Sequence, residues 1–413
     1  MLALEASTSA ISYMALALLI GQLAAAGFLL PGNDPSALRR SLLTAAKVSL
    51  LVFLCVALLA LMVQGAKLQH GFPTTELLWR YLTLALSGKV WIARETYGVA
   101  MLIEIIWTLG KTEVSANLAR WVAVSALPLV ASRSLASHAV AVRDDTTIAV
   151  VADVIHLLAT ALWAGGLVAL WQIFYLNNRH NQLSPALIAE TVNRFSRLAL
   201  ASVALLFFTG VYQSWIHVGS LNILKNTEYG NALMLKLAIF ACMVAVGAFN
   251  AFNLVSTKPR LNKLANTYNH VRAVSQRALT RIGAESLLGL LIFSITGLLT
   301  ALPPGVHAVH QTTAAATVQS LSPPEGASVK IISPTSDQIF TSDRVPLKFN
   351  LTKGKRGDHV HAYVDGELMG MFESEQGTLN GVAPGRHTLE LRVVAEDHQT
   401  ELDASDRTEF VVK

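Results

Sequence analysis

The stretch ADVIHLLATALWAGG, residues 152–166, lies inside an apolar run from Ile148 to Phe174 that is long enough to span a bilayer. It carries a carboxylate and an imidazole, Asp153 and His156. Ionisable side chains in such a run are costly unless a partner or a ligand compensates them. The two residues are three apart, so on a helix they share one face. The sequence therefore places a polar site, in need of a compensating partner, within a membrane helix.

The composition puts the whole chain in the membrane class. Of its 413 residues, 53% are hydrophobic and 14% are charged, whereas a soluble domain carries about a quarter charged residues. The net charge of +5 is interpreted through the loops that orient a membrane protein, and no nucleic-acid partner is expected. Cys55 and Cys242 stand alone in apolar runs and offer neither a disulfide framework nor a thiolate metal motif.

Apolar runs long enough to cross a bilayer recur eight times along the first three quarters of the chain. They cover approximately 11–30, 42–64, 93–110, 117–137, 148–174, 197–217, 232–254 and 283–302. Glu5, with no basic residue ahead of the first run, favours a retained first span over a signal peptide.

The charges of the loops predict the orientation of these spans. Lys and Arg total 13 in one set of alternate loops and 5 in the opposite set; the first set is 31–41, 111–120, 177–197 and 255–282, and the second is 65–89, 138–147 and 218–231. Positively charged loops stay on the cytoplasmic side. We therefore expect a multi-pass protein of the bacterial inner membrane with both termini in the periplasm.

The chain changes character after Pro303-Pro304. Residues 305–325 are rich in Ala, Thr, Ser and Pro and are interpreted as a linker. Short β-patterned runs separated by turn signals follow, at Ala327–Ser333, Arg344–Leu351, His359–Asp365, Glu367–Phe372, Arg386–Ala395 and Thr408–Val412. The predicted fold is a mainly α, polytopic membrane bundle over 1–304, followed by a small all-β Ig-like sandwich over 326–413.

Histidines gather on the predicted outer side of the membrane. His138 ends the fourth span, His156 lies about 12 Å into the fifth, and His217 ends the sixth. Imidazole can bind a transition metal, relay protons, ligate haem or simply hydrogen-bond. We expect His138 and His156 to form a facing metal-binding pair, with Asp153 orienting the His156 ring or facing the outer vestibule. His217 adds a ligand or, beside Trp215, anchors the interface.

The predicted β-sandwich has a histidine cluster of its own. His359 and His361 are two apart on a predicted strand, so their side chains share one face. Both could bind one copper ion, with His398, next to Asp397, or His387 as a candidate third donor. The alternative is a pair of surface histidines beside charged neighbours.

Several motifs in order resemble the membrane domain of the copper resistance protein D family. The resemblance covers approximately residues 120–305 and extends to the first three spans only in general hydropathy. The motifs are Ser137-His138-Ala139, Asp153 to His156, Trp163-Ala164-Gly165-Gly166, Arg194-Phe195-Ser196-Arg197, Thr209 to Ser214, Tyr229-Gly230, Leu235-Lys236-Leu237, Ala284-Glu285, Leu299-Thr300 and Pro303-Pro304.

The resemblance implies an eight-span bacterial inner-membrane protein that binds copper and moves it inward from the periplasm. Some relatives carry a fused periplasmic copper-binding domain, whose ligand motif the C-terminal residues here do not match. The expected cargo is copper ion, and the expected partners are membrane lipid and a periplasmic copper-binding protein. Gly165-Gly166 would permit close helix approach beside the path.

Two other functions fit the same residues. A cytochrome-b-like electron carrier would use His138 and His156 as haem ligands. A membrane-anchored copper chaperone would act through its outer domain alone. Zinc or nickel would also suit the ligand types. No Gly-x-x-x-x-Gly-Lys nucleotide loop occurs, nothing indicates a hydrolase, kinase or nuclease, and we do not expect an enzyme.

Overall fold

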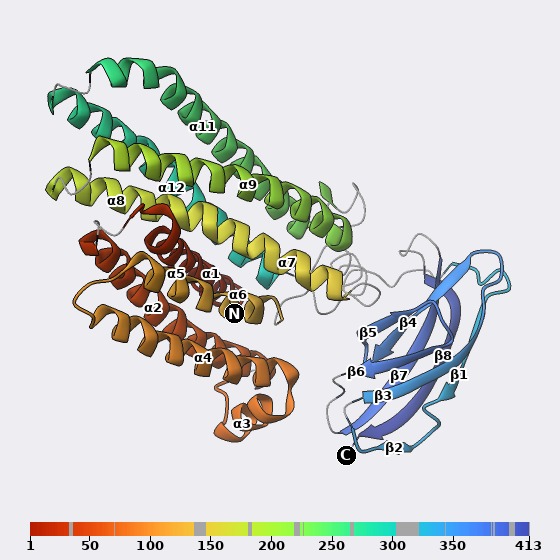
Figure 1. The fold of residues 1–413 in the computed structure, drawn as a ribbon. Coiled ribbons are helices and arrows are strands. Elements are labelled where there is room, and N and C mark those ends of the chain that lie inside the picture. Colours follow the sequence, from red (N-terminus) through yellow and green to blue (C-terminus); the bar gives the residue numbers. More distant parts are fainter. Residues whose placement is uncertain are drawn as a thin grey trace. The chain divides into compact units, whose positions relative to one another are not determined.

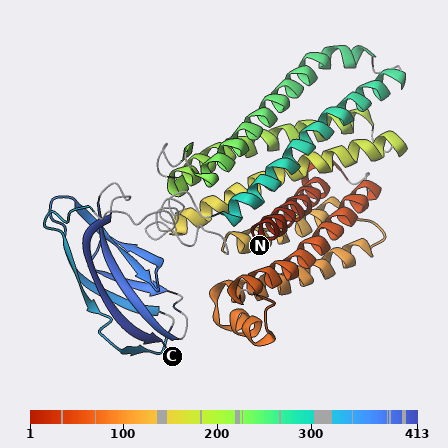
Figure 2. The ribbon, with the colours of Figure 1, turned by 180° about the vertical axis from the view of Figure 1, so that it is seen from behind.

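The protein is described by a computed structural model that covers residues 1–32, 36–69, 71–135, 146–180, 184–218, 224–225, 227–264, 268–302, 322–342, 344–380, 382, 385–395 and 401–412. The chain divides into two compact units, Met1–Ala308 and Val309–Lys413. The first, the membrane unit, is helical, and the second, the β unit, is built of strands (Figures 1 and 2). This is the predicted fold class. Most of the predicted linker, 305–325, lies outside the described residues.

The membrane unit is a bundle of long helices with several shorter ones (Figure 1). Its described residues include two π-helical turns: η1 (Ala25–Leu29) continues α1, and η3 (Ala161–Gly165) joins α7 to α8. The α-helices are α1 (Leu2–Ala24), α2 (Ser36–Gln69), α3 (Thr75–Leu84), α4 (Leu86–Leu109), α5 (Ala116–Ser125), α6 (Leu127–Ser134), α7 (Thr146–Thr160), α8 (Gly166–His180), α9 (Pro185–Val218), α11 (Glu228–Leu264) and α12 (Tyr268–Ala301).

Among the described residues, 6 helices are long and apolar enough to cross a membrane, rather than the predicted eight: Leu2–Leu29, Ser36–Lys67, Thr147–Arg179, Ala186–Ile216, Glu228–Asn250 and Leu279–Ala301. The predicted span 93–110 lies in α4, which carries Lys89 and a buried Arg94–Glu95 ion pair. The predicted span 117–137 divides into α5 and α6, because Pro128 starts a new helix. Arg40 of α2 nevertheless donates to Leu109 O and Lys111 O, so the turn after α4 lies at the same end of the bundle as the predicted loop 31–41.

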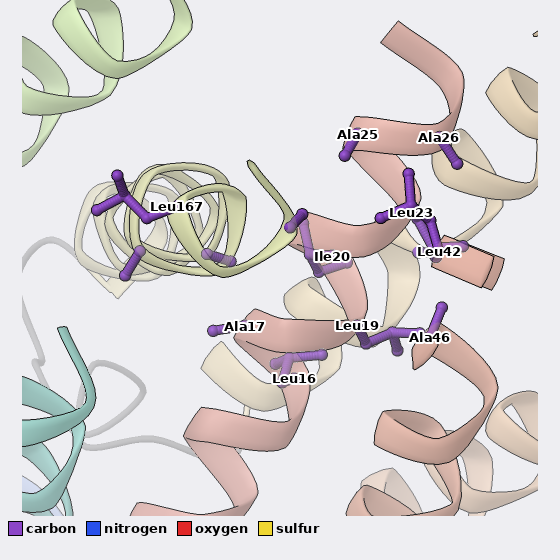
Figure 3. Close-up of a cluster of buried hydrophobic side chains, with 14 of the residues drawn as sticks. Leu16, Ala17, Leu19, Ile20, Leu23, Ala25, Ala26, Leu42, Ala46 and Leu167 are labelled. Atoms are coloured by element: carbon purple, nitrogen blue, oxygen red, sulfur yellow. The ribbon is translucent and has the colours of Figure 1, made fainter. Parts of the chain in front are cut away.

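The first helix, α1, lies at the centre of the membrane unit. It packs against α2, α5, α8, α12 and η3, and 78% of its membrane-length window is buried, against at most 39% for the other five. Its side chains Leu16, Leu19, Ile20 and Leu23 meet Leu42 and Ala46 of α2, and Leu167 of α8 lies on its other side (Figure 3). This cluster is the main apolar core of the unit.

Small residues let η3 approach α1 closely. A Cβ atom on Gly165 would lie 1.9 Å from the carbonyl oxygen of Ala17, and one on Gly21 would lie 2.1 Å from the carbonyl carbon of Gly165. Neither glycine can therefore carry a side chain at this crossing. The predicted close approach at Gly165-Gly166 is present, and it is made with α1.

Three arginines bind the carbonyl groups that η1 leaves at the end of the central helix. Arg39 is fully buried, and it donates from Nε to Ala26 O (3.1 Å) and from Nη2 to Leu30 O (3.2 Å) and Gly32 O. Arg120 Nε donates to Gly27 O (3.0 Å), and Arg194 Nη1 donates to Phe28 O (3.2 Å). We call Arg39, Arg120 and Arg194 the arginine collar. It satisfies carbonyls that have no partner within the helix.

The β unit consists of two sheets with strand orders β1-β3-β6 and β2-β8-β7-β4-β5. The predicted strands are present, and β2, β6 and the first half of β8 are additions. The strands are β1 (Ser328–Ser333), β2 (Gln338–Phe340), β3 (Arg344–Thr352), β4 (Gly357–Val364), β5 (Glu367–Phe372), β6 (Gln376–Asn380), β7 (Gly385–Ala395) and β8 (Glu401–Val412).

Alternating side chains of the two sheets form the core of the β unit. Val345, Leu347 and Phe349 of β3 belong to the same buried cluster as Val360 and Ala362 of β4. Because successive side chains of a strand point to opposite faces, this places the histidines of β4 on the other face of the five-stranded sheet.

Candidate metal sites

Two neighbouring helices, α7 and α9, hold the polar residues of the membrane site. They pack against each other, and His156 Nδ1 of α7 lies 2.9 Å from Thr209 Oγ1 of α9. Thr209 Oγ1 in turn donates to the carbonyl oxygen of Leu205 at 2.6 Å. A Cβ on Gly210 would lie 3.8 Å from His156 Cε1, so the imidazole rests against the α9 backbone.

The contacts of Thr209 favour one tautomer of His156. A hydroxyl has one proton to donate, and Leu205 O lies 2.6 Å from Thr209 Oγ1. When Thr209 donates to Leu205 O, it accepts a hydrogen bond from His156, and Nδ1 then carries the ring proton. In a neutral imidazole the lone pair then belongs to Nε2. A hydrogen bond that fixes one ring nitrogen in this way is typical of metal-binding histidines.

Asp153 does not hold the His156 ring. Nδ1 of that ring is bonded to Thr209, and Asp153 Oδ1 instead accepts from Gln213 Nε2 at 3.2 Å. Thr209 and Gln213 are four apart on α9, and Asp153 and His156 are three apart on α7, so the two helices meet through a double polar contact. Of the two predicted roles for Asp153, orienting the imidazole is wrong.

A cationic side chain compensates the charge of Asp153. Lys236 of α11 is half-buried and interacts electrostatically with both Asp153 and His156. Tyr13 of α1 lies within electrostatic range of Asp153 and of Arg133, whose guanidinium group sits 4.4 Å from the centre of the tyrosine ring. Sequence reasoning did not assign Thr209, Gln213 or Lys236 a role. Their polarity within apolar runs was the available signal.

The other predicted membrane ligands are not placed by the structure. His138 lies outside the described residues. His217 is in the last turn of α9, and its side chain is outside the description. The facing pair of His138 and His156, and a contribution from His217, therefore stay predictions.

The histidine pair of the β unit is buried and close. His359 and His361 are each 1% exposed, so the alternative of surface histidines is wrong. Their Nε2 atoms lie 3.1 Å apart, and their ring centroids lie 5.0 Å apart. Two metal–nitrogen bonds of about 2.05 Å spanning this gap would enclose an angle of about 100°, which suits a tetrahedral or a square-planar ion. The pair thus fits a bound metal.

Charged groups lie beside this pair. His359 Nδ1 is 3.4 Å from Asp358 Oδ2. A hydrogen bond from Lys353 Nζ (3.1 Å) holds the pKa of Asp358 below its usual range, against a weaker effect of burial. On the same face, His361 packs edge-on to Tyr363. The predicted third donor, His398, lies outside the described residues, and within the described part of the chain no three His, Cys, Asp or Glu side chains converge on one point.

Part of the membrane unit matches a known protein family. Residues 189–299 match the family model of copper resistance protein D. This part of the chain is similar to the copper resistance protein D family. The resemblance predicted from the sequence is thereby confirmed, and the matched residues include Thr209, Gln213 and Lys236 of the membrane site. Asp153 and His156 lie before the match.

Two curated proteins with copper functions in their names are similar to this chain. Copper transport protein CutJ of Bacillus subtilis (strain 168) is 27% identical over 242 residues, which cover 57% of this chain and 41% of that protein. Copper resistance protein D of Pseudomonas syringae pv. tomato is 28% identical over 142 residues, which cover 34% of this chain and 46% of that protein. The matched region is less than half the length of each relative.

One solved structure aligns with the chain only weakly. A structure of Clostridium thermocellum CbhA fibronectin(III)-like modules covers 21% of this chain and 94% of its own, at 21% identity. Its TM-score of 0.18 is too low to assign the fold of the β unit.

Proposed function

We propose that this protein transports copper across the bacterial inner membrane, inward from the periplasm, through a site at His156. The observation that carries the proposal is the contact between His156 Nδ1 and Thr209 Oγ1, which leaves Nε2 available as the ligating atom of a polar group inside an apolar bundle. The match of residues 189–299 to the copper resistance protein D family and the names of both relatives support copper as the cargo.

The remaining predicted ligands complete the proposed outer site. His138 faces His156, with His217 and Asp153 beside them. Lys236 neutralises Asp153 when no metal is bound. Both termini and the β unit are periplasmic in this proposal, as the loop charges predict. There His359 and His361, with His398, capture copper and receive it from a periplasmic copper-binding protein. The protein performs transport without covalent chemistry and is not an enzyme.

Uptake of copper by proteoliposomes that contain the full chain tests the proposal. His156→Asn keeps a donor for Thr209, because the asparagine amide nitrogen occupies the place of Nδ1, and removes Nε2. We expect uptake to fall by about tenfold or more, the usual size of a damaged metal site. The matched control is His387→Asn, since His387 of the β unit also bonds through Nδ1, to Asp365 at 2.7 Å.

Two results would overturn the proposal. One is copper uptake by the His156→Asn protein at the wild-type rate. The other is a Soret band in the visible spectrum of the purified protein, which would assign the histidines to haem. If deletion of the β unit abolishes copper tolerance in cells while His156→Asn has no effect, the protein is instead a membrane-anchored chaperone.

A further inference from the structure

One face of α11 carries a row of residues that extends from the His156 site into the bundle. Lys236, Met243 and Asn250 follow one another at seven-residue intervals, so they share a helix face and are separated by about 10 Å of rise each. Lys236 belongs to the site at His156. The other two lie progressively farther from it along the helix.

Met243 occupies the middle of this row and is fully buried. It is 0% exposed. Its Cε lies 3.6 Å from the point where a Cβ on Gly289 of α12 would stand, and Ala164 Cβ of η3 lies 3.3 Å from that point. The Met243 thioether, Gly289 of α12 and the π-helical turn η3 therefore lie together at one depth in the bundle. π-helical turns within helices are frequent at functional sites.

The far end of the row holds a buried carboxylate. Glu285 of α12 is 5% exposed, and it accepts a hydrogen bond from Asn250 Nδ2. Glu285 Oε2 also lies 3.7 Å from the Cβ position of Gly247. Gly247 is one helical turn beyond Met243, so the carboxylate and the thioether are neighbours along α11. Within the described side chains, no Lys or Arg lies within ion-pair distance of Glu285.

The two groups have the complementary chemistry that a soft univalent cation needs. A thioether is a soft ligand that favours Cu(I). A buried carboxylate whose partner among the described side chains is the neutral Asn250 amide lacks a balancing positive charge there, which a bound cation would supply. We propose that Met243 and Glu285 form a transit site for Cu(I), deeper in the bundle than His156. This inference rests on the proposed transport function and extends its path past the outer site.

The alternative is that Met243 only fills space and that Glu285–Asn250 only joins two helices. Conservative variants distinguish a Cu(I) site from a purely structural role. Met243→Leu keeps the volume of the side chain and removes the sulfur. Glu285→Gln keeps an acceptor for Asn250 and loses the charge. Each has a matched control in the same protein. Met234→Leu changes a methionine of the same helix that is 38% exposed. Glu104→Gln changes a carboxylate of α4 that accepts from Ser125 at 2.8 Å.

The experiment measures Cu(I) uptake into proteoliposomes under reducing conditions, and Cu(I) retained by the solubilised protein against a chelator. For Met243→Leu and Glu285→Gln we expect uptake to fall by about tenfold and retained Cu(I) to fall by one ion. Both control variants should match the wild type. Unaltered elution of each variant as a single species shows that the fold is retained.

The possible failures are distinct. If Met243→Leu and Glu285→Gln transport and retain Cu(I) like the wild type while His156→Asn does not, the transit site is overturned and the proposed function stands. If the wild type takes up no more Cu(I) than empty liposomes, the proposed function fails and the transit site with it. A loss in the control variants equal to that in the test variants also overturns the site.

Discussion

The Nε2 atoms of His359 and His361 lie 3.1 Å apart on one buried face of β4. Without a metal, one of these nitrogens must donate its proton to the other, because two lone pairs at this distance repel. A metal ion would require both Nε2 atoms to be unprotonated, with the protons on Nδ1. Asp358, 3.4 Å from His359 Nδ1, favours that tautomer of His359.

We therefore predict that the full chain loses one copper ion when either histidine of this pair is replaced. His361→Ala should weaken copper binding at the pair by about tenfold or more, because a chelate loses one of its two placed donors. Isothermal titration of the solubilised protein measures the loss, with His387→Ala as the control. Equal copper content in the His361→Ala and His387→Ala proteins would exclude a metal at this pair.

Thr209→Val removes the acceptor for His156 Nδ1 at almost unchanged volume. With the ring free to change tautomer and orientation, copper uptake should fall by about tenfold. Thr296→Val is the matched control, because Thr296 Oγ1 makes a similar bond to Ile292 O (2.8 Å) on α12. If both valine variants transport copper equally well, Thr209 does not position the histidine.

The β unit should lose stability in acid through Asp365. Burial disfavours its ionised form, but the Thr388 N–H (2.8 Å) and His387 outweigh that effect and lower the pKa of Asp365 from 3.8. A carboxylate whose pKa is depressed on folding contributes stability that is complete above about pH 5 and is lost as pH falls through the folded pKa. Unfolding followed by intrinsic fluorescence at stepped pH measures this.

The control for this titration is Asp365→Asn. Asparagine accepts from the Thr388 N–H and tolerates the positive φ of 52° at this turn position, but it does not titrate. The variant should be less stable than the wild type near neutral pH and should show a shallower loss in acid. An identical pH profile in the two proteins would show that other carboxylates dominate.

Arg39→Met should strongly destabilise the membrane unit. It removes the donor to the carbonyl groups of Ala26, Leu30 and Gly32. An unsatisfied buried carbonyl costs about 1–3 kcal/mol, so a loss of about 3 kcal/mol is expected. Arg80→Met removes an exposed i,i+4 ion pair with Glu76 on α3 and should cost about 0.5 kcal/mol or less. Thermal unfolding in detergent compares them. Similar melting temperatures for both variants would contradict a structural role of the collar.

Gly165→Ala tests the crossing of η3 with α1. The new methyl group would lie 1.9 Å from Ala17 O, so one backbone must move, and about 1–3 kcal/mol or more should be lost. Gly210→Ala is the control for stability, because its methyl group would meet His156 Cε1 at an ordinary 3.8 Å. A Gly165→Ala protein as heat-stable as Gly210→Ala would show that the crossing can adjust.

Much of this architecture could be predicted because periodicity is a local property. The apolar runs around Ile148 and the alternation in β3 and β7 each arise from one element and its environment. The strands β2 and β6 were missed, because β2 has three residues and β6 contains Gly377. The run 117–137 was read as one span, although Pro128 interrupts it.

The partners of the polar residues were harder to predict, since a single sequence does not tell which helix faces which. Asp153 and His156 were recognised as costly in an apolar run, but their contacts with Gln213 and Thr209 depend on how α9 packs on α7. A lysine near the end of a span ordinarily extends toward the interface, so the position of Lys236 in the sequence does not indicate a partner. Its interaction with Asp153 became evident only in the folded bundle.

The arginine collar links the folding of the bundle to its insertion. Arg39, Arg120 and Arg194 all fall within the predicted loops whose charge indicates the cytoplasmic side, and their guanidinium groups also bind η1. Removing the three collar arginines in order to reverse the membrane orientation would also destabilise the centre of the bundle. The positive charges that orient this part of the chain therefore cannot simply be moved to other loops. The orientation would have to be reversed by adding positive charge to the opposite loops.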